Sequence, residues 1–285
     1  MAARPFLSDA QWARIEPLLP DRSPRRGGRW RDHREVIDAI AFKYRTGTPW
    51  MDLPEHFGSC KGAHNRLRKW AADGTWEKVF TALLARADAE GDLDWVVAVD
   101  STIVRAHQHA AGARPKGAPA GEPDDHALGR SRGGLTTKIH LAADGRCRPL
   151  AFVVTPGQAG DAPAFEHVMA RIRVPQPIGR PRTRPDTILG DKAYSSRAIR
   201  SHLRRRGIRA VIPQPADQAA NRKRLGSRGG RPPTFDRQAY KQRNTVERAI
   251  NKIKQWRGPA TRYDKTATIY LAGLHLAAIH IWSAR

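Results

Sequence analysis

Apolar residues recur at helical spacing through the N-terminal third of the chain. Ser8 and Gln11 have the spacing of a capping box, and Pro20 is expected to stop the helix that they begin. The same periodicity predicts four helices, at residues 8–19, 33–47, 60–72 and 76–89. Residues 1–92 are therefore predicted to form an all-α domain.

The period changes after residue 94. Short runs of β-branched residues predict five strands, at residues 95–99, 137–142, 150–155, 187–189 and 210–212. Helices are predicted at residues 161–172, at 196–206, from 235–240 to 256, and at 267–282. Three successive strands followed by alternation predict an antiparallel meander that gains parallel neighbours. This is the element order of the ribonuclease H-like fold, so residues 93–285 are predicted to form an α/β domain with a mixed five-stranded sheet and covering helices.

Residues 51–70 have the pattern of a helix-turn-helix. A short helical turn at residues 53–56 is followed by Gly58 and by the helix at residues 60–72. That helix would expose His64 together with the side chains that we expect to contact DNA, which are Lys61, Asn65, Arg68 and Lys69. The alternative is an ordinary helical hairpin with a solvated basic face.

The chain is strongly basic. Its 285 residues include 51 Lys and Arg against 27 Asp and Glu, which gives a formal net charge of +24. Such a charge opposes a compact fold unless a polyanion neutralises it, and that polyanion is usually nucleic acid. A ribosomal-type structural protein and an arginine-rich proteome are the alternatives. Three Gly-, Pro- and Arg-rich segments are expected to be loops that lie along phosphates, at residues 105–134, 173–185 and 214–234.

Cysteine content and hydropathy bear on the compartment. Cys60 and Cys147 are isolated thiols with no CxxC pair, which argues against a cysteine zinc site and suits a reducing cytoplasm. Residues 269–282 are the most apolar stretch, but they are too few to span a bilayer. We therefore expect no membrane association and a cytoplasmic protein, which joins the nucleoid when it binds DNA.

Two aspartates directly follow apolar strands. Asp100 comes after the apolar run at residues 96–99, and Asp191 comes after residues 187–189 and Gly190. A carboxylate at the end of a buried strand is costly in free energy unless it has a partner or a function. One such aspartate is usually a turn residue, but two in one basic domain indicate a site.

A third carboxylate, Glu247, lies inside the predicted long helix. At about 100° per residue, Tyr240, Arg243, Glu247 and Lys254 fall on one charged stripe beside an apolar arc. Arg243 and Glu247 also have the spacing of a routine surface ion pair. The helix is therefore expected to pack one side and to present this stripe beside it.

Three carboxylates suit phosphodiester transfer. This reaction uses divalent metal ions, often two at about 4 Å, to activate the attacking oxygen and to stabilise the leaving one. Mg²⁺ prefers carboxylate oxygens. We therefore expect Asp100, Asp191 and Glu247 to be catalytic and to bind two Mg²⁺ ions, for which Mn²⁺ could substitute. The side chains expected to hold the DNA backbone beside them are Tyr240, Arg243 and Lys254.

The spacing Tyr240-x2-Arg243-x3-Glu247-x6-Lys254 resembles the signature around the catalytic Glu in bacterial insertion-sequence transposases of the DDE class. The blocks VVAVDST, TPGQAGDAPAFEHV, LGDKAYSS and RNTVERAINKIKQWRGPATRYDKTA are similar to insertion sequence family five, within the family-four superfamily. The blocks LSDAQWARIEPLLP, LPEHFG and RLRKW resemble the N-terminal domain of that family. The resemblance covers nearly the whole chain.

The resemblance implies a DNA transposase with a ribonuclease H-like catalytic domain and Asp100, Asp191 and Glu247 as metal ligands. Such an enzyme binds the terminal inverted repeats of its insertion sequence, cleaves a strand at each end and transfers it to target DNA. Its partners would be double-stranded DNA and, because two ends must be joined, a second copy of the chain in a dimer. The rival hypotheses are a nuclease that cuts without joining, a non-catalytic DNA-binding regulator and a ribosomal-type protein.

Several other residues are weaker candidates. His107 and His109 could bind a metal, although chance pairs are common among eleven histidines. Asp161 is placed to cap the helix that follows it. Tyr194 and Trp256 could stack on a distorted base, but core packing is the more common role of such residues.

Overall fold

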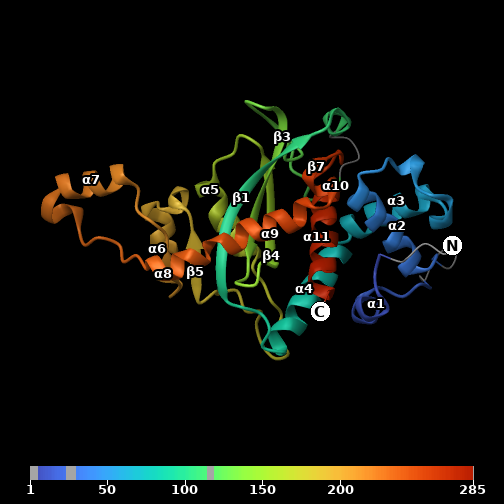
Figure 1. The fold of residues 1–285 in the computed structure, drawn as a ribbon, viewed down its shortest axis with the longest axis horizontal. Helices are drawn as coiled ribbons and strands as arrows, with labels where there is room; N and C mark the ends of the chain where they lie inside the picture. The colour runs from blue at the N-terminus through green and yellow to red at the C-terminus, as the bar shows by residue number, and fades with distance from the viewer. Residues whose placement is uncertain (1–5, 24–29, 114–118, 285) are drawn as a thin grey trace.

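The N-terminal part of the chain is helical in the computed structural model, which describes residues 6–23, 30–113 and 119–284. Helix α1 begins at a capping box in which Ser8 and Gln11 bond reciprocally, as predicted. The α-helices of this part are α1 (Asp9–Ile15), α2 (His33–Thr46), α3 (Cys60–Ala72) and α4 (Thr75–Ala89), and the 3₁₀ turn η1 (Glu16–Leu18) follows α1. Helix α3 packs against both α2 and α4 (Figure 1).

The short helical turn predicted at residues 53–56 is present as the 3₁₀ turn η3 (Glu55–Phe57), and a second 3₁₀ turn, η2 (Trp50–Asp52), precedes it. Pro54 precedes η3 and Gly58 ends it with φ 66°, so too few residues remain between them for an α-helix. Helix α2 also packs against α3. Whether this segment and α3 act as a DNA-binding helix-turn-helix stays a prediction.

A mixed sheet forms the other part of the molecule. Its five main strands are β1 (Val96–Ala106), β3 (Gly134–Ala143), β4 (Pro149–Pro156), β5 (Thr187–Gly190) and β6 (Arg209–Val211). They lie in the order β4-β3-β1-β5-β6. β1–β3 and β3–β4 are antiparallel, whereas β1–β5 and β5–β6 are parallel. The predicted meander with parallel neighbours, and hence the ribonuclease H-like order, is confirmed.

Two short strands extend this sheet within the described residues. β2 (Gly129–Ser131) pairs with β3, and β7 (Thr261–Arg262) pairs with the far end of β1. Strand β1 is longer than predicted because it stays paired with β3 as far as Arg105. Asp100 therefore lies inside β1 and not after its end.

Helices cover both faces of the sheet. Successive residues of a strand point to opposite faces, and on β1 the side chain of Ser101 contacts the first residue of α5 (Asp161–Arg171). Thr102, on the other face, contacts the last residue of α9 (Asn244–Lys254). Helix α6 (Arg197–Arg205) connects β5 to β6. Figure 1 shows α9 crossing in front of the strands.

The long helix predicted to end at residue 256 is interrupted. It consists of α8 (Arg237–Tyr240), the 3₁₀ turn η7 (Lys241–Arg243) and α9, and a short α10 (Arg257–Ala260) follows. Tyr240, Lys241, Arg243 and Asn244 all have right-handed helical backbone angles. The path of the chain is thus continuous, and the change is a local tightening of the hydrogen-bond pattern.

Helix α11 (Ala267–Ser283) joins the two parts of the molecule. It packs against α3 and α4 on one side and against β4 and α9 on another. In Figure 1 it stands between the sheet and the N-terminal helices. Residues from both sides of position 92 belong to one hydrophobic core, so the division into domains 1–92 and 93–285 stays a prediction.

The three segments predicted as basic loops contain some regular structure. Residues 105–134 include the end of β1 and β2, and residues 173–185 include an isolated bridge between Val174 and Arg182. Residues 214–234 hold helix α7 (Ala216–Arg224) and the turn η6 (Gly226–Gly229). Helix α7 has no buried residue and therefore no apolar periodicity to reveal it, although Ala, Gln, Lys and Arg are good helix formers. None of the described helices has the length and apolar character needed to cross a membrane.

Candidate active site

Adjacent parallel strands bring two of the predicted carboxylates together. The last pair in the β1–β5 register is Val99 with Gly190. Asp100 directly follows Val99, and Asp191 directly follows Gly190. A Cβ atom at Gly190 would lie 3.3 Å from the ring of Tyr194, so glycine permits this close packing. Asp191 leaves the strand as the cap of a 3₁₀ turn, where its Oδ1 accepts a bond of 2.8 Å from the amide of Ala193.

Arg243 connects Asp100 to the third carboxylate. One guanidinium nitrogen donates to Oδ2 of Asp100 at 2.7 Å, and another donates to Oε1 of Glu247 at 2.7 Å. The side chains of Asp100 and Arg243 are 18% and 20% exposed, whereas that of Glu247 is 49% exposed. The predicted i,i+4 pair thus forms, but it is half of a three-residue bridge between α9 and β1.

Charges interact at the place where β5 ends beside β1. Burial raises the pKa of Asp100, and the carboxylates of Asp191 and Glu247 raise that pKa further. The Ser101 amide and Arg243 act in the opposite direction. Burial alone would lower the pKa of Arg243, but Asp100 and Glu247 outweigh it and raise that pKa. The arginine is therefore held in its charged form as the counter-ion of the site.

The three carboxylates are of the chemical type that binds a hard divalent cation, but they are not grouped around one point. Burial is the largest cause of the raised pKa of Asp100, but Asp191 and Glu247 also contribute to it. Carboxylate oxygens are the ligands that Mg²⁺ prefers. Within the described residues, however, no three His, Cys, Asp or Glu side chains are grouped closely enough to hold a metal ion. Arg243 takes the position of a cation between Asp100 and Glu247. The metal-ligand role of the three carboxylates stays a prediction.

The two other members of the predicted stripe flank the carboxylates. Nζ of Lys254 donates to Oγ1 of Thr102 at 2.6 Å, and burial lowers the pKa of this lysine. Thr102 lies on the same face of β1 as Asp100, two residues further along. Tyr240 is partly buried against Phe235, with 5.2 Å between the ring centroids. Burial raises the pKa of Tyr240, and the charges of Asp191, Asp100 and Glu247 raise it further, so this tyrosine lies near the carboxylates.

Asp161 has a contact that the sequence did not reveal. It is the first residue of α5 and not its cap, which is Gly160. Its Oδ1 accepts bonds from Oγ of Ser101 at 2.7 Å and from Nζ of Lys138 at 3.0 Å. Because Ser101 also donates its amide to Asp100, this network holds the strand next to the carboxylate. The only sequence signal was the position of Asp161 at the start of a helix.

The four residues predicted to contact DNA from the N-terminal region lie apart from the carboxylates. They are all exposed on α3, as predicted, and they are Lys61, Asn65, Arg68 and Lys69. Nζ of Lys69 lies 4.3 Å from the ring centroid of Trp30. Figure 1 shows α3 on the far side of α11 from the sheet. The structure thus contains two separate basic surfaces, which are the exposed face of α3 and the stripe with Arg243 and Lys254 beside the carboxylates.

The remaining candidates have structural roles. His107 accepts a bond from the amide of His109 and packs on Tyr263, with 5.1 Å between the ring centroids. Neither histidine belongs to a metal-binding group among the described residues. Tyr194 and Trp256 are buried, with 1% and 6% of their surfaces exposed, so both belong to the core.

Two family models match different parts of the chain. A family model described as "Putative transposase of IS4/5 family" matches residues 7–80. A second, described as "Transposase DDE domain", matches residues 91–282 and so covers more than half of the chain. The second match contains Asp100, Asp191 and Glu247.

Individual relatives resemble parts of the chain. "Uncharacterized protein y4sN" of Sinorhizobium fredii is 42% identical over 108 residues, which are 38% of this chain and 82% of that protein. "Putative transposase for insertion sequence element IS6501" of Brucella ovis is 31% identical over 148 residues, which are 52% of this chain and 98% of that protein. Among solved structures, "Mos1 transposase paired-end complex with left transposon end" is matched over 82% of this chain and 80% of that chain, with 15% identity and a TM-score of 0.25.

Proposed function

The chain belongs to the transposase DDE domain family, and from that premise we propose that Asp100, Asp191 and Glu247 are the three catalytic carboxylates of an insertion-sequence transposase. The observation that carries the proposal is the Arg243 bridge. It joins Asp100 to a helix 143 residues away, at the point where Asp191 leaves the neighbouring strand. An ordinary ion pair on the surface of one helix would not include a side chain from a neighbouring strand.

The proposed reaction has two phosphoryl-transfer steps. In the first, water attacks the phosphorus at an end of the element, and the bond to the 3′ oxygen breaks to release a 3′ hydroxyl. In the second, that hydroxyl attacks a phosphorus of target DNA and displaces the 3′ oxygen of the target nucleotide that was bonded to this phosphorus. Both steps depend mainly on positioning and charge stabilisation, which fits a site made of rigid strand and helix residues.

The family implies divalent metal, and the three carboxylates are the residues that would hold it. We propose Mg²⁺, with Mn²⁺ as a substitute and two ions per site. Ions bound there would supply the positive charge that the attacking and leaving oxygens require. Arg243 would have to release Asp100 or Glu247 in that state, and its guanidinium would then be free to contact a DNA phosphate.

The DNA contacts of the proposal come from both basic surfaces. Tyr240, Arg243 and Lys254 would hold the backbone at the scissile phosphate, because they border the carboxylates. The exposed face of α3, with Lys61, Asn65, Arg68 and Lys69, would bind the terminal inverted repeats in the major groove. Two ends must be joined in one reaction, so we propose a dimer that acts on cytoplasmic DNA of the nucleoid.

The test is cleavage of a DNA fragment that carries the ends of the element, with and without Mg²⁺. Glu247→Gln preserves the size of the side chain and removes its charge, so we expect wild type to nick at the ends and the variant to bind without nicking. The loss should be at least about a hundredfold, as for an electrostatic catalytic group. Glu16→Gln, an exposed change elsewhere, is the control and should cleave like wild type.

Three outcomes would contradict the proposal. Equal cleavage by wild type and Glu247→Gln would remove Glu247 from the active site. Cleavage without joining of a pre-cut end to a plasmid would identify a nuclease instead. Binding of the ends by wild type with no Mg²⁺-dependent cleavage would identify a regulator.

A further inference from the structure

A hollow of about 750 Å³ lies between helix α6 and the arm formed by residues 213–236, which carries α7. Figure 1 shows this arm at the end of the molecule opposite the N-terminal helices. None of the described residues that line the hollow is acidic. Six arginines line it: Arg197, Arg200 and Arg204 on or beside α6, and Arg222, Arg228 and Arg231 on the arm.

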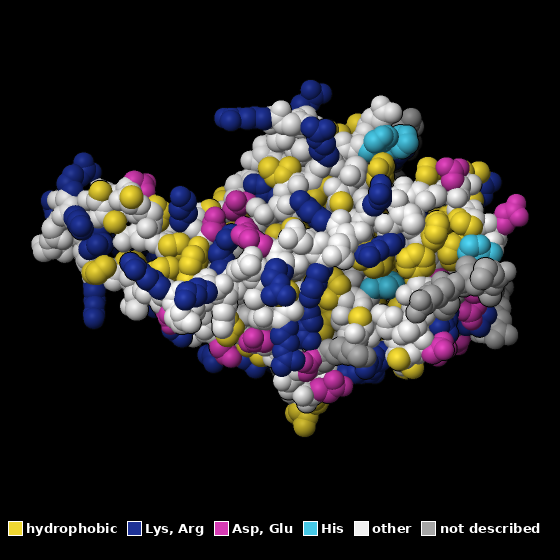
Figure 2. Space-filling model, in the orientation of Figure 1, with side chains coloured by type: hydrophobic (Ala, Val, Ile, Leu, Met, Phe, Trp, Pro, Cys, Tyr) yellow, Lys and Arg dark blue, Asp and Glu magenta, His cyan; other side chains and the backbone are white. Residues whose placement is uncertain are grey.

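None of these six arginines forms a salt bridge with a carboxylate among the described residues. Arg200 is the one held firmly, because its guanidinium donates to the carbonyl oxygens of Ser195 at 3.2 Å and Ile212 at 2.8 Å. Arg209, just outside the hollow, shows the usual alternative by pairing with Asp236. A concave surface with charges of one sign concentrates its field and attracts a polyanion. Figure 2 shows lysine and arginine side chains gathered on the arm.

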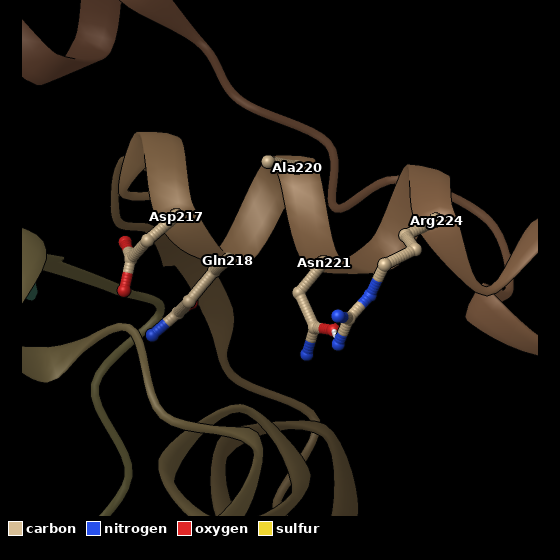
Figure 3. Close-up of a pocket in the computed structure, with 5 residues that line it drawn as sticks. All are labelled: Asp217, Gln218, Ala220, Asn221 and Arg224. Atoms are coloured by element: carbon tan, nitrogen blue, oxygen red, sulfur yellow. Dashed lines mark hydrogen bonds between the residues drawn. The ribbon is translucent and has the colours of Figure 1, made fainter.

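The arm is connected to the body close to the carboxylates. Nε2 of Gln218 on α7 donates to Oγ of Ser195 at 3.0 Å. Ser195 directly follows the three-residue 3₁₀ turn η5 (Lys192–Tyr194), which Asp191 caps. Figure 3 shows Gln218 and Asn221 directed to the same side of α7, with Ala220 on the opposite side. Gln218 and Asn221 both line the hollow, so the arm turns its polar side toward α6.

We propose that this hollow binds the phosphate backbone of the DNA on which the carboxylates act, with α6 and the arm gripping it from two sides. The inference rests on the proposed function and adds a second contact for the same strand, beyond the scissile phosphate. Guanidinium groups bind phosphate oxygens in a bidentate manner and carry no base specificity at the backbone. The grip should therefore be independent of DNA sequence and sensitive to salt.

The test compares two double variants of the full chain. Arg197→Gln/Arg204→Gln removes two exposed charges from the hollow, and Lys78→Gln/Arg86→Gln removes two exposed charges from α4. Binding is measured over a range of salt concentrations, with one duplex that carries an element end and one of unrelated sequence. The logarithm of the DNA association constant falls as the logarithm of the salt concentration rises. For the hollow variant, this negative slope should become less steep by about 0.9 for each phosphate that the protein no longer neutralises. The α4 variant should keep the wild-type slope, and both should unfold at the wild-type temperature.

The outcomes separate this inference from the proposed function. A reduced slope with both duplexes supports a contact with the DNA backbone, and a reduced slope with only one duplex contradicts its independence of DNA sequence. A hollow variant with the slope of the α4 variant overturns the inference, even if Glu247→Gln abolishes cleavage as expected. If Glu247→Gln cleaves normally while the hollow variant has a reduced slope, the active-site proposal fails and the DNA contact stands.

Discussion

Single residues set the electrostatics of this protein, and Asp38 on α2 is a case outside the candidate site. Its side chain is buried, and its Oδ1 accepts a bond of 3.2 Å from the amide of Leu7. Burial raises the pKa of Asp38 to about 6, and the amides of Leu7 and Phe6 only partly oppose that effect. The folded chain therefore binds this proton more tightly than the unfolded chain does.

The stability conferred by protonated Asp38 should be complete below about pH 4 and should be lost as pH rises through 6. The loss in the free energy of unfolding is roughly 3 kcal/mol at most, at about 1.4 kcal/mol per pKa unit. Asp38→Asn should remove this part of the pH dependence, as measured by urea unfolding between pH 4 and pH 8. Asp52→Asn, an exposed control, should follow wild type. Identical pH profiles for wild type and Asp38→Asn would contradict the assignment.

At the scale of elements, Tyr44 on α2 fits against two glycines. A Cβ atom at Gly273 of α11 would lie 2.3 Å from the ring of Tyr44, and one at Gly258 of α10 would lie 2.5 Å from it. The ring is fully buried, and its hydroxyl donates to Asp264 at 3.1 Å. This packing joins an N-terminal helix to two C-terminal ones.

Gly273→Ala should destabilise the fold even though alanine is the better helix former by about 1 kcal/mol. The added methyl group overlaps a fully buried aromatic ring, and overpacking of this kind costs about 1–3 kcal/mol. Chemical denaturation of wild type and Gly273→Ala measures the difference. In a Tyr44→Leu background the penalty should disappear, and a penalty that persists there would show that the ring is not its cause.

Local patterns predicted most elements, and nonlocal contacts account for those that differ. The capping box at Ser8 and the full extent of α3 depend on neighbours in the sequence, so they could be predicted. The extension of β1 to Ala106 depends on pairing with β3 and, at its end, with β7. Helix α7 has no apolar face to reveal it. In the candidate site, the pair of Arg243 with Glu247 is local, but its bond to Asp100 spans 143 residues and needed the fold to show it.

At the scale of the whole molecule, the described core is continuous between the helical part and the sheet. Helix α11 contacts elements of both parts. When two regions share a core in this way, neither is expected to unfold alone. The molecule should therefore behave as one cooperative unit, in spite of the two family matches.

Thermal unfolding should show one transition. Tryptophan fluorescence and far-UV circular dichroism should give coincident curves, because tryptophans such as Trp70 and Trp282 are buried in the same core. A fragment of residues 1–92, which lacks α11, should show little cooperative unfolding in the same measurement. Two separated transitions in the full chain, or a stably folded fragment, would establish independent domains.

The position of α11 also has a consequence for how errors in protein synthesis affect the cell. A product that stops before residue 267 would keep the exposed face of α3 but would lack the helix that fills the core behind it. Cellular proteases are expected to degrade such unfolded chains, so these chains should not accumulate. Copies that end before α11 should thus compete poorly for any DNA that the α3 face binds, because α11 packs directly behind α3.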